Sequence, residues 1–128
     1  MINDEQVQPS AAVVETPFLS DTTVQVESVS LSDGGLAIFM ISKHWNAVVR
    51  FEQTYGFRVL DELDLTEFWP QCSLAKGWLF EVKAGGWKAL EQTRPHFFSG
   101  RCEWVKEYLV VGRDECVSVL AKERPSVA

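Results

Sequence analysis

Residues 1–42 of this 128-residue chain contain no lysine and no arginine. They carry six carboxylates, whereas the rest of the chain carries twelve acids and twelve bases, so the formal charge of −6 arises in the first third. A one-sided field of this kind attracts positively charged partners and repels polyanions. We therefore expect a basic protein partner, no direct nucleic acid binding and no membrane docking.

Cysteine and histidine are scarce, and their spacing suits neither a disulfide scaffold nor a metal site. The three cysteines, Cys72, Cys102 and Cys116, are far apart and form no C-x-x-C pair, which predicts reduced and inert thiols. The two histidines, His44 and His96, are 52 positions apart, so we expect no metal and no cofactor. A catalytic Cys102–His96 pair lacks a third group to orient it, and the chain is not expected to be an enzyme.

Long apolar runs are also missing. No stretch approaches the ~20 apolar residues of a membrane-spanning helix. Residues 1–8 are polar and acidic where a signal peptide has a basic start and an apolar stretch, so a cytoplasmic protein is expected. The length matches one domain. We expect a flexible acidic tail over residues 1–20, a single domain over 21–123 and a short tail over 124–128.

Two segments carry hairpin signals. Asp33-Gly34 separates two apolar runs within residues 22–41, and both positions tolerate the positive φ of a tight turn. A change of alternation near Ser28 indicates a bulge. A second hairpin is predicted over residues 104–121, although helical spacing over 102–109 keeps a helix there as an alternative. The expected cross-strand pairs are Leu31 with Leu36, Val29 with Ile38, Val110 with Val117, and Tyr108 with Val119.

Residues 43–55 are predicted to form an amphipathic helix, capped by Ser42 and ended by Gly56. Glu52 projects into the apolar arc of this helix. A carboxylate buried there must be paired, hydrogen-bonded or raised in pKa, so Glu52 is either a structural ion-pair partner or a general acid/base. The alternative function is therefore a ligand-binding or enzymatic domain with a pocket between helix and sheet, lined by His44, Trp45 and Glu52.

The C-terminal half is predicted to be antiparallel sheet. A strand over residues 77–83 turns at 84–86 and returns over 87–92, which places Phe80 opposite Leu90. The element order β-β-α-β-β-β-β indicates an α+β fold. We expect a two-layer structure with an antiparallel β-sheet of about six strands and one main amphipathic helix packed on one face.

One segment combines acids with large apolar residues. Residues 61–69, named the acidic segment below, hold four carboxylates, and Pro70 limits them to a short turn of helix in a connection. Acids can steer a basic partner while an aromatic side chain anchors it. The sequence thus predicts a non-catalytic protein-binding module of inhibitor, antitoxin or immunity type. The candidate partner-binding residues are Asp61, Glu62, Asp64, Glu67 and Trp69.

Two further alternatives concern the core and the assembly. Leu63, Leu65 and Phe68 can instead point into the core, which would leave the acids as a solvated surface. The chain can also be a structural subunit of a larger assembly that self-associates through an exposed edge strand over residues 36–41 or 116–121. As a binding module it is expected to be a monomer or a homodimer.

Overall fold

Residues 8–128, which the computed structural model describes, form nine strands, one short α-helix and two 3-10 helices. The strands make two antiparallel sheets that pack face to face. Sheet A has the order β1-β6-β7-β8-β5, with the bounds Ser10–Val13, Leu79–Ala84, Lys106–Val111, Glu115–Ala121 and Gly56–Asp61. Sheet B has the order β2-β3-β4-β9, with the bounds Gln25–Ser32, Gly35–Ile41, Asn46–Phe51 and Ser126–Val127.

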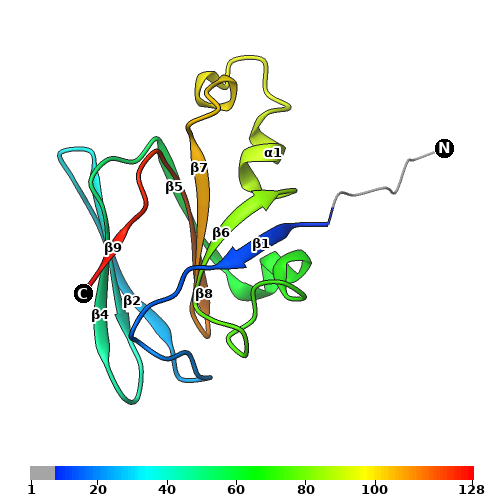
Figure 1. Cartoon of the computed structure of the whole chain (residues 1–128). Coiled ribbons are helices and arrows are strands. Elements are labelled where there is room, and N and C mark those ends of the chain that lie inside the picture. The colour runs from blue at the N-terminus through cyan, green and yellow to red at the C-terminus, as the bar shows by residue number, and fades with distance from the viewer. Residues whose placement is uncertain (1–7) are drawn as a thin grey trace.

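The helical segments are η1 (Glu62–Phe68), α1 (Trp87–Glu91) and η2 (Phe98–Arg101). Figure 1 shows η1 and α1 on the side of sheet A that faces away from sheet B, and η2 next to α1 beyond the end of β7, so the molecule has three layers. We call the helical segments the outer layer.

The main hydrophobic core lies between the two sheets. In β3, Leu36, Ile38 and Met40 are buried while the residues between them are only partly buried, which is the period of two that a strand imposes. Sheet A contributes Tyr108, whose ring lies 5.5 Å from that of Phe51 across the core. Burial of such side chains supplies most of the stabilisation of a sandwich.

Sheet A is buried on its second face as well. Leu109 and Val111 of β7 point away from sheet B and pack with Leu65 and Phe68 of η1. Consequently every residue of β7 after Lys106 is buried. The near-continuous apolar runs of β7 and β8 follow from this double coverage.

Both predicted hairpins are confirmed. Asp33 and Gly34 have positive φ values of 51° and 80°, and the register shifts between Val26 and Ser28, where the bulge was expected. Residues 106–111 form a strand, which excludes the helical alternative for them. The four predicted cross-strand pairs are present: Leu31↔Leu36, Val29↔Ile38, Val110↔Val117 and Tyr108↔Val119.

The predicted helix over residues 43–55 is wrong, because this segment contains the strand β4. Ala47, Val49 and Phe51 are buried at alternate positions, and the β-branched pair at 48–49 suits a pleated surface. Ser42 caps no helix. Its hydroxyl oxygen accepts the N–H groups of His44 and Trp45 in the turn between β3 and β4.

The predicted return strand over residues 87–92 is also wrong. These residues contain α1, and the cross-strand partners of Phe80 are Leu109 and Val13 instead of Leu90. The reason is a distant carboxylate: Glu107 accepts the backbone N–H groups of Trp87 and Lys88, and so caps a helix that has no local capping side chain.

The antiparallel, sheet-rich part of the fold prediction is confirmed, but the finer description is corrected. Residues 8–128 form nine strands in two sheets in place of about six strands in one, and no main amphipathic helix packs on a face. Residues 10–13 and 126–127, assigned from sequence to the tails, are the strands β1 and β9. Residues 1–7 lie outside the described part.

The expected edge strands are corrected too. The segments 36–41 and 116–121 belong to β3 and β8, which are interior strands; the edges are β1, β5, β2 and β9. Within the described range, none of the helices has the length and apolar character needed to cross a bilayer.

Candidate functional site

The acidic segment is anchored at both ends. Asp61 closes β5 and its carboxylate accepts the N–H of Leu63 at 2.9 Å, which caps η1. Leu65 and Phe68 insert into the outer face of sheet A and are each 2% exposed. One cap and two core contacts therefore hold this short helix in place, and the side chains between these contacts must face outward.

The outward side chains include most of the predicted partner-binding residues. Asp61, Asp64 and Glu67 are exposed and Glu62 is partly buried. Trp69 is 46% exposed and Leu63 is 65% exposed. The alternative that Leu63, Leu65 and Phe68 point into the core is confirmed for Leu65 and Phe68 and is wrong for Leu63. Among residues 8–128, no lysine, arginine or histidine forms an ion pair with these four carboxylates.

A groove of about 650 Å³ runs between η1 and α1 over the outer face of sheet A. Asp64 and Glu67 line it from η1, while Trp87 and Leu90 line it from α1. Arg58 of β5 also lines the groove. The acidic segment is thus both an exposed surface and one wall of a concave site of a size typical for small ligands.

Arg58 is the central cation of this groove. Its guanidinium lies 5.2 Å from the centre of the Trp87 ring, a cation–π contact, and its Nε donates to Ser118 Oγ at 3.4 Å. Partial burial lowers the pKa of Arg58. The negative charges of Glu107, Glu67 and Glu91 act in the opposite direction and raise this pKa by less. In the part of the chain that the structure describes, the side chain of Arg58 makes no further hydrogen bond and no ion pair.

Glu107 is the buried charged group of this face and is only 3% exposed. Its two carboxylate oxygens accept the N–H groups of Trp87 at 2.9 Å and Lys88 at 2.7 Å. Burial raises the pKa of Glu107, although these two donors and the charges of Arg58 and Lys88 act in the opposite direction. Sequence reasoning missed Glu107. The available signal was a charged residue that shares a strand face with Leu109 and Val111.

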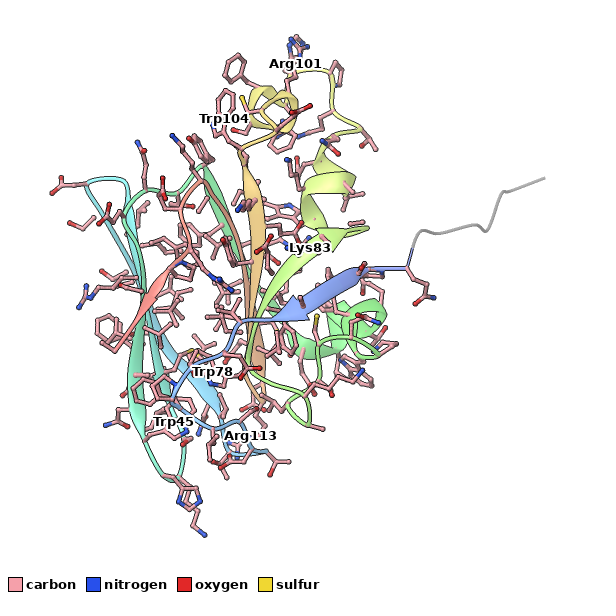
Figure 2. All side chains as sticks on the ribbon, in the orientation of Figure 1. Trp45, Trp78, Lys83, Arg101, Trp104 and Arg113 are labelled. Carbon is pink, nitrogen blue, oxygen red and sulfur yellow. The ribbon has the colours of Figure 1, made fainter. Side chains whose placement is uncertain are left out.

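The alternative pocket around Glu52 is not formed. Glu52 follows β4 and is exposed, as is His44. Trp45 is engaged in an aromatic cluster, with its ring 5.4 Å from that of Phe18 and 5.3 Å from that of Trp78. Figure 2 shows Trp45 and Trp78 together at one end of the molecule, away from Arg101 and Trp104 at the other. These tryptophans therefore serve the core.

The cysteines are all buried and free. Burial raises the pKa of Cys72 to about 12 and that of Cys116 to about 11, so neither thiol supplies a thiolate near neutral pH. Cys102 is buried while His96 is exposed in the loop before η2, and the Cys102 thiol points its weak hydrogen bond to the carbonyl of Phe98 instead of to His96. Within residues 8–128, no three His, Cys, Asp or Glu side chains converge as metal ligands.

Comparison with models of known protein families, with curated proteins and with solved structures gives no match to this chain.

Proposed function

We propose that this protein is a non-catalytic binding module that docks a basic protein partner through its acidic segment, as inhibitors, antitoxins or immunity-type proteins do. One observation carries the proposal: exposed carboxylates without ion-pair partners in residues 8–128 stand beside two exposed apolar side chains, Leu63 and Trp69. All of them are held on a helix that Leu65 and Phe68 fix to sheet A.

The acids and the apolar side chains have different parts in this binding. Exposed charges contribute mainly to association, because a pair at 4 Å in water is worth only about 1 kcal/mol but acts over a Debye length. The six acids of residues 1–42 add to the long-range negative field. Trp69 supplies apolar contact area once the partner has docked, and an aromatic anchor of this kind mainly slows dissociation.

The test begins with capture of the partner on the full chain at low salt, followed by measurement of association and dissociation rates by surface plasmon resonance. The variant carries D61N, E62Q, D64N and E67Q, and D61N is chosen because asparagine also caps helices. The matched control changes the same number of charges elsewhere, at the exposed residues Glu15, Glu27, Glu103 and Glu123, each to Gln.

We expect the acidic-segment variant to associate at least tenfold more slowly than the unchanged protein, and its association rate to lose most of its salt dependence. The association rate of the control variant should fall much less. Trp69→Ala is expected to raise the dissociation rate and leave the association rate nearly unchanged. Equal effects of the variant and the control would assign the attraction to net charge alone. An affinity indifferent to salt and to all of these changes would refute the proposal.

A further inference from the structure

The groove between η1 and α1 contains a cation whose donors are largely unused. Arg58 is partly buried, yet its one hydrogen bond runs through Nε to Ser118 at the long distance of 3.4 Å. Half-buried guanidinium groups normally make several hydrogen bonds or pair with a carboxylate. The two terminal nitrogens have no such partner among residues 8–128, so they can take a bidentate contact from a ligand.

The carboxylates near Arg58 differ in how they are occupied. Glu107 binds the N–H groups of Trp87 and Lys88, and Glu91 accepts from the Trp87 indole at 3.2 Å and from Arg94. Neither carboxylate lies within ion-pair distance of the guanidinium. Glu67 acts on Arg58 through its charge but lies beyond ion-pair contact. One cation, Arg58, and two carboxylates, Asp64 and Glu67, thus line the groove without forming an ion pair with each other.

The remaining lining is largely apolar. Leu60 and Leu65 belong to the sheet and to η1, while Trp87, Ala89 and Leu90 come from α1. Of these, Leu90 is 61% exposed, so the α1 wall offers apolar surface that no other part of residues 8–128 covers. Polyanions such as phosphates are disfavoured here, because Asp64 stands beside Glu67 at the rim.

We propose that this groove is a binding site for a small zwitterion with an apolar side chain, that is, an apolar amino acid. Its carboxylate binds the Arg58 guanidinium, its ammonium group binds Glu67 with Asp64 nearby, and its side chain packs on Trp87 and Leu90. A groove of about 650 Å³ has room for such a molecule. The zwitterion site does not require the partner proposed above, although Asp64 and Glu67 belong to both proposed surfaces.

The test is titration of the full chain with three probes of similar shape, and binding is measured by isothermal titration calorimetry or by ligand-observed NMR. L-phenylalanine carries both charges, 3-phenylpropionate lacks the ammonium group, and 2-phenylethylamine lacks the carboxylate. We expect L-phenylalanine to bind and each of the other probes to bind roughly tenfold to a hundredfold more weakly, the usual loss for one charged hydrogen-bonded contact.

The variants separate the two charges. R58Q is expected to abolish the advantage of L-phenylalanine over 2-phenylethylamine, and E67Q to abolish its advantage over 3-phenylpropionate. R50Q is the matched control, since Arg50 is an exposed arginine on β4 of the other sheet, and it should bind like the unchanged protein. R58K keeps the charge without the planar fork, so it should fold even if R58Q does not, and bind L-phenylalanine weakly.

Three results would overturn the inference: no saturable binding of L-phenylalanine, equal binding of all three probes, or unchanged binding by both R58Q and R58K. Partner binding serves as the separate readout. A protein that binds its basic partner but not L-phenylalanine would refute the zwitterion site alone. A protein that binds L-phenylalanine but no basic partner would refute the docking proposal alone.

Discussion

Gly86→Ala should destabilise the protein because Gly86 lies against the buried carboxylate of Glu107. A Cβ at this position would lie 2.5 Å from Glu107 Oε2 and 2.7 Å from Val82 Cγ1. The backbone itself tolerates alanine, since φ is −102° and ψ is −150°. The whole effect must therefore come from crowding. Glu107 has to move, and with it the two hydrogen bonds that hold the start of α1.

The magnitude follows from what Glu107 loses. A hydrogen bond to a charged group contributes ~1.5–3 kcal/mol, and overpacking alone costs ~1–3 kcal/mol. Because the carboxylate keeps part of its contacts after it shifts, we expect the free energy of unfolding to fall by about 3 kcal/mol. For a chain of this length the melting temperature changes by about 4 °C per kcal/mol, so the melting temperature should fall by about 12 °C.

The assay is thermal and urea unfolding followed by circular dichroism, with Gly56→Ala as the control. A Cβ at Gly56 would lie 3.5 Å from the Trp87 ring, which is ordinary contact, so the control should remain within about 1 kcal/mol of the unchanged protein. If Gly86→Ala and Gly56→Ala melted within about 2 °C of each other, the contact between Gly86 and Glu107 would have no part in stability.

Two further predictions concern buried polar groups. Because burial raises the pKa of Glu107, the stability it contributes is present below the unfolded value near 4.5 and is lost as the pH rises through the folded value. As the pH rises from 4 to 7, the free energy of urea unfolding of the unchanged protein should therefore fall relative to that of E107Q. A rise relative to E107Q would contradict the raised pKa of Glu107. Tyr108→Phe should be neutral or stabilising by up to ~1 kcal/mol, since the Tyr108 hydroxyl is buried without a hydrogen-bond partner in residues 8–128; a loss above 1 kcal/mol in the same assay would show that a partner exists.

The hairpins were predictable because their information is local. Asp33-Gly34 sets the turn, and the alternation on both sides of it sets the register. The structure of residues 43–55 could not be predicted in this way, because their apolar residues satisfy the spacing of a helix and of a strand alike. Only the neighbouring strands β3 and β9 decide between these possibilities. The two-sheet arrangement likewise depends on contacts between distant segments.

The candidate site also has a part that could be predicted from the sequence and a part that could not. The short helical turn of the acidic segment could be predicted from Pro70 and from the spacing of Leu65 and Phe68, which fixes the side that faces solvent. The groove could not, because its other wall is α1. The cap of that helix comes from Glu107, a residue about 20 positions further along the chain. Arg58 gave no signal in the sequence beyond being one charge among many.

The burial of sheet A on both faces has a consequence for local unfolding. The apolar cluster between the sheets and the two smaller clusters of the outer layer are built from different buried side chains, and Leu74 is the partly buried residue that packs on both the central cluster and an outer one. The outer layer can therefore open while the sandwich stays closed. Amide hydrogens of η1 and α1 should then exchange with solvent at a lower free energy of opening than those of β7 and β8. A ligand or partner held by this layer would slow exchange there first. The proposed binding surface thus lies in a layer that can open without the sandwich, and an occupant would stabilise that layer against opening.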